Sequence, residues 1–357
     1  MPTIAIQDDH IIRVLSVVLD PDCPKERADG FADYYSVDMP EFPKWCEEIR
    51  ARYPAAYPSK VLLAKSEEEF RSMLPEADLV VTEDYPIGEA ELAIAPRLKF
   101  VQGFGSDTRN IDEAACAARG IGTAPLHRRV NTAVAEHAFA LLMTLAKKIT
   151  ETNKLLTVEA LQAKGWPARV YDRRHTANSN WARVSGIMNL RGATLGIVGL
   201  GSIGRDVARW GNAFGMKVIY TQRNPLSAEL EAAFGATFAP MDDLLAQSDA
   251  ISLHVPMNES TRGLIDAGRF AKMKQGAILI DVSRAEVIDR DALLDAMKSG
   301  KLGGLGMDVH YKEPVDADDP LLAFDNVALS PHIAIGTRVN GAEDVEEMVA
   351  NLAGAMK

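Results

Sequence analysis

The feature that most constrains the fold is a glycine pattern in the second half of the chain. The run from Leu195 to Gly204 reads L-G-I-V-G-L-G-S-I-G and places Gly199, Gly201 and Gly204 in a G-x-G-x-x-G pattern. An apolar run precedes the turn and an amphipathic segment follows it, as in the strand–turn–helix that holds a dinucleotide pyrophosphate. Glycine permits the tight turn, the approach of phosphate to the backbone and the close packing of helix on strand. A chance glycine-rich turn is the alternative, and the strand-like run Lys217–Tyr220 that follows disfavours it.

The residues around this turn also bear on which dinucleotide is bound. Ser202 and Ile203 begin the expected helix, whose N-terminus would face the phosphates. After the next strand, where an acid usually bonds the ribose 2′-hydroxyl of NAD, the chain has Gln222. The neighbouring Arg223 offers donors suited to a 2′-phosphate. NADP is therefore favoured over NAD, with dual use, or a plain surface role for Arg223, as alternatives.

Composition limits the class of protein. A chain of 357 residues exceeds the usual size of one domain, so two domains are expected. The net charge of −11 disfavours nucleic acid or an anionic membrane as partner and leaves a small molecule. Cys23, Cys46 and Cys116 have neither disulfide nor metal-site spacing, so no metal is expected. Together with an N-terminal segment unlike a signal peptide, they predict a cytoplasmic protein.

Short apolar runs alternate with helical patterns along most of the chain, which predicts parallel sheets with right-handed crossovers. The first set predicts a small flavodoxin-like domain and comprises the β-branched run Val14–Leu19, then Lys44–Tyr53, Lys60–Leu63, Glu67–Leu74, Asp78–Thr82, Leu98–Gln102, Ile111–Arg119 and Ile121–Ala124. The second set comprises Thr194–Val198, Ile203–Phe214, Lys217–Tyr220, Ala228–Phe234, Met241–Gln247, Ala250–Val255, Ala277–Val282, Asp289–Lys298, Leu305–Val309 and Val327–Ser330. The predicted fold class is α/β, with two Rossmann- or flavodoxin-like doubly wound parallel-sheet domains separated by an active-site cleft.

Three further segments complete this organisation. Asn131–Thr150 predicts one long helix, because its apolar residues share a face at helical spacing. Glu151–Arg191 is polar, contains Trp166 and Trp181, and has no clean periodicity, so its role is left open. Asn340–Met356 predicts a helix that returns to the first domain.

Polar residues lie where several expected strands of the second set should end: His254, Arg284, Asp308 and His332. Carboxyl ends of parallel strands share one edge, so these side chains can converge on one crevice. Reduction of a 2-keto acid needs a cation for the carboxylate, a proton donor, and a group that keeps the donor charged. Arg284, His332 and Glu313 supply these types, with Glu313 bonded to the second imidazole nitrogen. Each residue alone has an ordinary structural alternative, but their grouping at strand ends favours catalysis.

Further motifs accompany these residues in a fixed order from about Leu98 onward: Asn131, Glu136-His137, Gly199–Gly204, His254-Val-Pro256, Val282-Ser-Arg284, Asp308-Val, Glu313-Pro314 and Ser330-Pro-His332. As a set they resemble the D-isomer-specific 2-hydroxyacid dehydrogenase family. The resemblance implies a discontinuous substrate-binding domain, residues 1–124 with 333–357, and a dinucleotide-binding Rossmann domain, residues 125–332, inserted into it.

The resemblance also implies roles for individual residues. Arg284, Glu313 and His332 would form the catalytic triad, with Arg284 and His332 touching the substrate. Asp308 would help to hold the nicotinamide end, and His254 and Pro256 would be among the residues that bind the cofactor. The backbone at Phe104 and Gly105 would receive the substrate carboxylate.

Three departures from the family pattern are visible. Thr108 and Arg109 are extra between the Phe104 loop and Asn110, so substrate preference cannot be inferred from that loop. Ala285 replaces a glycine after the catalytic arginine, and Gln222 replaces the ribose-binding acid. None of these removes a catalytic group.

The sequence therefore predicts an NAD(P)-dependent enzyme that interconverts a 2-keto acid and a D-2-hydroxy acid, of the glyoxylate/hydroxypyruvate reductase type or related to it. The alternatives are a dinucleotide-sensing binding protein of the same fold, an amino-acid dehydrogenase, and a formate-dehydrogenase-like relative, which would carry glutamine in place of Glu313. A homodimer is expected from the resemblance. The substrate is left open, since Phe104, Trp181, Tyr311 and His310 either line the pocket or serve packing.

Overall fold

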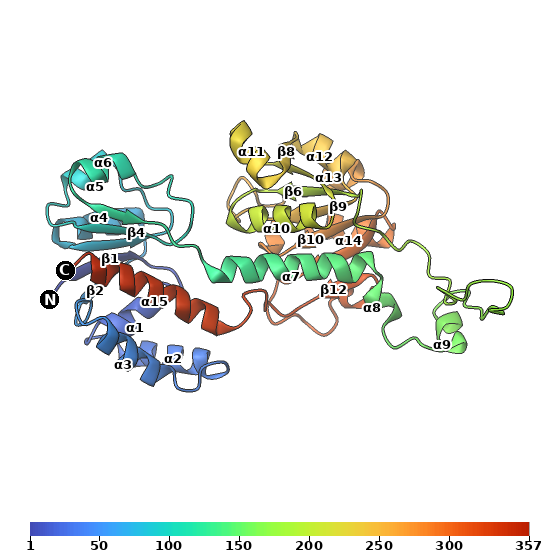
Figure 1. Ribbon diagram of the computed structural model, residues 1–357, viewed down its shortest axis with the longest axis horizontal. Helices are drawn as coiled ribbons and strands as arrows, with labels where there is room; N and C mark the ends of the chain where they lie inside the picture. Colours follow the sequence, from blue (N-terminus) through green and yellow to red (C-terminus); the bar gives the residue numbers. More distant parts are fainter. Residues whose placement is uncertain (357) are drawn as a thin grey trace. The chain divides into compact units, whose positions relative to one another are not determined.

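The computed structural model describes residues 1–356, which divide into two compact units (Figure 1). The first unit is Met1–Ala133 with Ile335–Lys357, and the second unit is Val134–Ala334. Each unit is built on one parallel sheet, with five strands in the first and seven in the second. The predicted α/β class with two parallel-sheet domains is confirmed. Among residues 1–356, no helix is both long enough and apolar enough to span a bilayer.

The first unit has the strand order β2-β1-β3-β4-β5, with every neighbouring pair parallel. This is the flavodoxin-like order that the sequence predicts. Its strands are β1 (Thr3–Gln7), β2 (Lys60–Ala64), β3 (Leu79–Thr82), β4 (Phe100–Gly103) and β5 (Gly122–Ala124). Its helices are α1 (Val14–Leu19), α2 (Lys25–Ser36), α3 (Phe42–Arg52), α4 (Glu67–Met73), α5 (Glu89–Ala93), α6 (Glu113–Ala118), α15 (Arg338–Gly354) and the 3₁₀ helix Leu74–Glu76.

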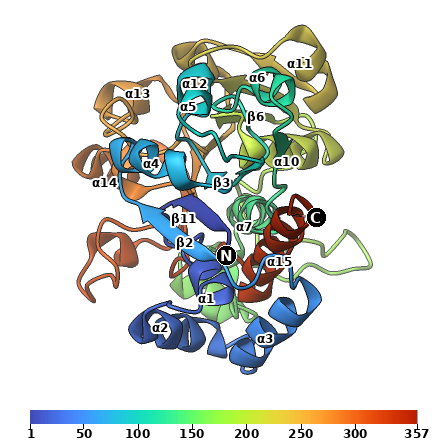
Figure 2. The same cartoon turned by 90° about the vertical axis from the view of Figure 1, so that its left-hand side faces the viewer.

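Alternating side chains of these strands build two cores, one on each face of the sheet. Ile4 and Ile6 of β1 belong to the core under α1, α2, α3 and α15, whereas Ala5 belongs to the core under α4, α5 and α6. Helix α15 contacts both α1 and β4, so the C-terminal segment is part of the first unit (Figure 2). A helix near Asn340–Met356 is confirmed.

The prediction for Val14–Leu19 is wrong: this β-branched run is helix α1, and the first strand is Thr3–Gln7. All six residues of α1 are buried, so no polar face reveals a helical period. The Asp9 carboxylate accepts from the backbone N–H groups of Ile11 and Ile12, which turns the chain into the helix. Helix α2 was not predicted either.

The second unit has the strand order β12-β11-β10-β9-β6-β7-β8, again with parallel neighbours. The order reverses between β6 and β9, and such a reversal creates the crevice in which doubly wound sheets bind ligands. Its strands are β6 (Thr194–Val198), β7 (Lys217–Thr221), β8 (Ala236–Phe238), β9 (Ala250–Leu253), β10 (Ala277–Asp281), β11 (Leu302–Met307) and β12 (Val327–Leu329).

The helices of the second unit surround this sheet, and one long irregular segment leaves it. They are α7 (Arg129–Ala146), which begins in the first unit, α8 (Ile149–Thr152), α9 (Val158–Ala163), α10 (Ser202–Ala213), α11 (Ala228–Phe234), α12 (Met241–Gln247), α13 (Ala267–Lys272), α14 (Arg290–Lys298) and the 3₁₀ helices Ala285–Val287 and Pro320–Ala323. Leu141 and Leu145 of α7 pack on Gly304 and Gly306 of β11. Residues 164–193 contain neither helix nor strand and extend away from the sheet (Figure 1).

Candidate active site

The glycine-rich turn joins β6 to α10 and has space for a ligand. Gly199 has φ +95°, and a Cβ there would lie 2.5 Å from the His254 carbonyl oxygen. A Cβ on Gly204 would lie 2.2 Å from the Gly199 oxygen. These two glycines are required by the protein's own packing. At Gly201, which precedes Ser202 and Ile203 at the start of α10, a Cβ would meet nothing within 4 Å. The open space at this helix N-terminus fits a dinucleotide pyrophosphate.

Gln222 and Arg223 follow β7 beside this turn. The Gln222 Oε1 atom accepts from the Leu200 N–H at 3.2 Å, and its Nε2 donates to the Asn224 oxygen at 2.7 Å. The amide is therefore held against the glycine-rich turn. Arg223 is exposed, and in the part of the chain that the structure describes its guanidinium has no hydrogen bond or ion pair.

His254 and Pro256 lie in the loop after β9, on the other side of the sheet's reversal point. The His254 N–H donates to the Val198 oxygen at 2.8 Å, and its Nε2 lies 2.8 Å from Ser252 Oγ. Burial lowers the pKa of His254 to about 3, so the imidazole is neutral. Its Nδ1 atom is buried without a partner among the described residues. The backbone of His254 thus packs on the glycine-rich turn, and its neutral ring does not serve as a proton donor.

Arg284 follows β10 in a turn that Asp281 fixes. The Asp281 side chain is fully buried and accepts from Ser283 N at 2.8 Å and Ser283 Oγ at 2.7 Å. Burial raises the pKa of Asp281 to about 7. Arg284 is exposed, and its guanidinium donates to the Ser283 carbonyl at 2.7 Å. No carboxylate within residues 1–356 forms an ion pair with it, so its remaining donors are available to an anion.

Glu313 and His332 form a directly bonded pair. His332 Nδ1 lies 2.8 Å from Glu313 Oε2, while Glu313 Oε1 accepts from the His310 N–H at 2.9 Å. Burial acts to raise the pKa of Glu313, but the bonds from His332 and His310 outweigh it and hold that pKa below its ordinary value. The carboxylate is thus ionised and bound to Nδ1, which leaves His332 Nε2 for another partner.

His332 adopts φ +55°, a conformation that side-chain-bearing residues rarely take, and Asp308 holds it there. The Asp308 carboxylate, only 1% exposed, accepts from Ile333 N at 3.0 Å and Ala334 N at 2.8 Å. It also accepts from Ser330 Oγ at 2.5 Å. One buried carboxylate therefore fixes the segment on both sides of the histidine.

His137 of α7 extends this network. Its Nε2 lies 2.7 Å from Ser330 Oγ and 3.4 Å from Asp308 Oδ1. The glutamate–histidine pair lines a cavity of about 560 Å³ within the second unit, together with His310, Leu322 and Leu329. A small organic acid fits a space of this size.

The loop after β4 in the first unit carries Phe104 and Gly105. The Phe104 ring is buried beneath the Arg128 guanidinium, whose carbon lies 4.0 Å from the ring centre, so this side chain serves packing. The Phe104 N–H already donates to the Thr82 oxygen at 2.8 Å. The Gly105 N–H has no hydrogen bond within residues 1–356, so it is the backbone donor left for an anion. The additional Arg109 is paired with Asp107.

Of the other aromatic candidates for the pocket, Tyr311 donates its hydroxyl to the Ile288 oxygen at 2.9 Å, and Trp181 lies in the irregular segment that leaves the sheet.

Sequence reasoning missed Asp281 and gave Ser330 and His137 no role. The position of Asp281, three residues before Arg284 at the end of an apolar strand, was the available signal. Within residues 1–356, no three His, Cys, Asp or Glu side chains are grouped to hold a metal ion.

Comparisons with known proteins agree with this geometry. The family model for the NAD binding domain of D-isomer specific 2-hydroxyacid dehydrogenases matches residues 139–334. A glyoxylate reductase of Korarchaeum cryptofilum is 34% identical over 269 residues, which are 75% of this chain and 76% of that protein. The crystal structure of a glyoxylate reductase from Paecilomyes thermophila aligns with 100% of this chain and 96% of its own, at 27% identity and a TM-score of 0.57. The D-lactate dehydrogenase of Aquifex aeolicus, solved with NAD and lactic acid, is also 27% identical, covers 99% of this chain and 94% of its own, and has a TM-score of 0.54.

Proposed function

Because this chain belongs to the D-isomer specific 2-hydroxyacid dehydrogenase family, we propose that it reduces a small 2-keto acid to the D-2-hydroxy acid, with glyoxylate and hydroxypyruvate as the first candidate substrates. The observation that carries the proposal is the Glu313–His332 pair at 2.8 Å, at the same edge of the sheet as Arg284, which has no ion-pair partner in the described part of the chain. Relatives named glyoxylate reductase support the choice of substrates.

The proposed roles follow from the contacts of each side chain. When bound, the reduced nicotinamide supplies a hydride to the carbonyl carbon. Arg284 binds the carboxylate and polarises the carbonyl oxygen through its unpaired donors. His332 donates a proton to that oxygen from Nε2, because Glu313 occupies Nδ1 and stabilises the charged ring. Asp308, although the resemblance implies a role at the nicotinamide, is assigned here to holding His332 in position.

NADP is proposed as the preferred cofactor. Gln222 places a neutral amide, rather than a carboxylate, beside the glycine-rich turn, so a 2′-phosphate meets no negative charge from it. The exposed Arg223 has all its donors available, in the part of the chain described, to bind such a phosphate.

Three further assignments remain proposals. Gly105 is proposed to receive the substrate carboxylate through its N–H, which has no acceptor within residues 1–356. A homodimer is proposed because the irregular segment after α9 and its neighbourhood expose Leu156, Val170 and Ile187 at 78%, 63% and 44%. A cytoplasmic location agrees with three unpaired cysteines, two of them buried.

The test is oxidation of NADPH and of NADH, followed by the loss of reduced nicotinamide absorbance, against glyoxylate, hydroxypyruvate, pyruvate and a bulky aromatic 2-keto acid. Turnover with one of the first two and a lower KM for NADPH would support the proposal. Dinucleotide binding without turnover of any keto acid would favour a dinucleotide-sensing protein instead. Turnover that requires ammonia would indicate an amino-acid dehydrogenase.

A further inference from the structure

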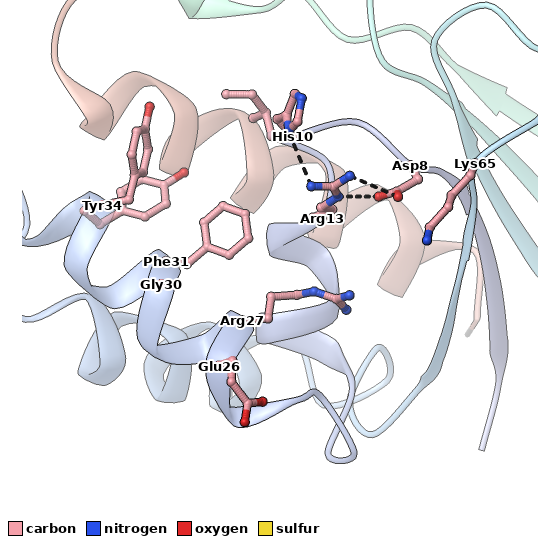
Figure 3. Close-up of a pocket in the computed structure, with 11 residues that line it drawn as sticks. Asp8, His10, Arg13, Glu26, Arg27, Gly30, Phe31, Tyr34 and Lys65 are labelled. Carbon is pink, nitrogen blue, oxygen red and sulfur yellow. Dashed lines mark hydrogen bonds and ion pairs between the residues drawn. The ribbon is translucent and has the colours of Figure 1, made fainter. Parts of the chain in front are cut away.

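A second cavity, of about 720 Å³, lies entirely within residues 8–65 of the first unit and shares no residue with the site above (Figure 3). Asp8 follows β1, Lys65 follows β2, and one face of α2 completes the wall. The cavity therefore opens at the carboxyl ends of two parallel strands, the edge at which sheets of this type receive ligands. Its size is that of a small-molecule pocket.

The charges lining this cavity are unbalanced. Arg13 is paired with Asp8, whose side chain is only 4% exposed. The two charges of this ion pair cancel, so this part of the cavity wall has no net charge. Arg27 donates from Nη1 to Ser16 Oγ at 3.0 Å but has no acidic partner among the residues that the structure describes. The Lys65 ammonium has neither a hydrogen bond nor an ion pair within residues 1–356. Two cations are thus uncompensated in a chain of net charge −11.

The positions of these side chains favour a shared ligand. Figure 3 shows Arg27 extending from α2, and Lys65 from the end of β2, into the space beside the Asp8–Arg13 pair. Glu26, the other acid of the lining, points away from them in the same view. An anion in the cavity would therefore meet both free cations without a nearby unpaired carboxylate.

Gly30 keeps the helical wall of the cavity clear. It lies inside α2, where glycine destabilises a helix relative to alanine, and a Cβ there would meet nothing within 4 Å. No packed neighbour explains the glycine. The half-buried Phe31 next to it packs against the core and presents an apolar surface to the same cavity.

We propose that this cavity binds a small organic dianion, with its charged group at Arg27 and Lys65 and its carbon body against Phe31. Two uncompensated cations match a double negative charge, and the planar guanidinium can bind two oxygens of a phosphate monoester or a dicarboxylate at once. The ligand is either a regulator or the distal anionic group of a substrate, and the shared chemistry is a dianionic oxygen group on an apolar body.

Binding can be tested on the full chain by calorimetry and by the backbone amide NMR signals of Gly30 and Phe31. The probes are phenyl phosphate, inorganic phosphate, benzylmalonate and acetate. Saturable shifts are expected with the dianions, and phenyl phosphate should bind about five- to ten-fold more tightly than inorganic phosphate because its ring covers apolar surface. No saturation by any dianion, or equal affinity for acetate, would overturn the proposal.

Variants test the location. Arg27→Gln and Lys65→Gln should each weaken phenyl phosphate binding about ten-fold or more, since each removes a charged donor. Lys25→Gln is the matched control, because Lys25 lies on the same helix, pairs with Asp29 and is outside the cavity. Gly30→Leu should abolish binding by filling the space while the unfolding midpoint is kept or raised. Equal effects of Lys25→Gln and Lys65→Gln, or unchanged binding to Gly30→Leu, would place the anion elsewhere.

Steady-state kinetics distinguish a substrate from a regulator as the source of the anion. This experiment alone rests on the proposed function. Competition between phenyl phosphate and the 2-keto acid would identify the cavity as receiving a distal group of the substrate. A change in kcat without competition would identify a separate regulatory ligand. The binding and variant measurements stand even if no keto acid is turned over.

Discussion

Asp308→Asn is the substitution that best tests how the proton donor is held. The carboxylate accepts from Ser330 Oγ, Ile333 N and Ala334 N in a site that is 1% exposed. The amide of asparagine retains one acceptor oxygen and turns an NH₂ group toward a backbone N–H. A hydrogen bond to a charged group contributes about 1.5–3 kcal/mol, so losing one and weakening the others should lower the free energy of unfolding by about 2–4 kcal/mol.

Asp308→Asn should also lower kcat, because Asp308 holds the backbone of His332. Its φ of +55° is of a kind that costs about 1–3 kcal/mol and persists only where neighbouring contacts enforce it. Without the Asp308 contacts the segment relaxes, and a shift of about 1 Å in a reacting group lowers the rate about 100-fold. We expect kcat to fall by roughly that factor while the Kd for NADPH changes less than about three-fold.

The assay combines urea unfolding, steady-state reduction of the best keto acid and NADPH titration by fluorescence. Asp249→Asn is the control, because Asp249 also accepts from a backbone N–H, that of Thr194 at 2.8 Å, and lies far along the chain from His332. It should lower stability but leave kcat unchanged. A normal kcat in Asp308→Asn with weakened NADPH binding would refute the positioning role and favour a role at the nicotinamide.

Four further outcomes are expected. His332→Ala should lower kcat by about 100-fold or more with NADPH binding intact, since general acid catalysis contributes about 10²–10⁴-fold. His175 is an exposed histidine, so His175→Ala should leave kcat unchanged. Equal turnover in the two variants would mean that another group donates the proton. Arg284→Lys should raise KM strongly because a bidentate contact is lost, and unchanged KM and kcat would place the carboxylate clamp elsewhere. Arg223→Gln should weaken NADPH but not NADH binding by about ten-fold or more, and an equal effect on both cofactors would contradict the 2′-phosphate contact. The pKa of Asp281 is raised to about 7, above its unfolded value, so the folded state binds an extra proton and the free energy of unfolding should fall as pH rises from about 4 to 7. Asp281→Asn should remove this pH dependence in urea unfolding measured across the same range. An unchanged pH dependence in the variant would contradict the prediction.

The fold could be predicted where a strand and a helix each carry their own pattern. β6, α10 and β7 follow from the glycine-rich turn and its apolar flanks, and α12 from an amphipathic run. Strand β8 was missed, because its residues Ala-Thr-Phe alternate in burial over only three positions and form no continuous apolar run. Helix α1 was misassigned because burial of all six residues removes the contrast on which such assignments depend.

The residues of the site could also be predicted only in part. Arg284, Glu313 and His332 could be singled out because their chemistry is rare at strand ends and their motifs are specific. The contacts of Asp308 could not, since its partners Ile333 and Ala334 bond through backbone atoms that carry no residue identity. Such contacts depend on how the loop folds, which composition and spacing do not encode.

The hydrogen bonds of Asp308 also tie together the two ends of the second unit. The chain passes between the two units after Ala133 and after Ala334. His137, just beyond the first passage, and Ala334, just before the second, both belong to the network around Asp308. The network therefore links the place where the chain enters the second unit to the place where it leaves, and it fixes the backbone beside His332 between them.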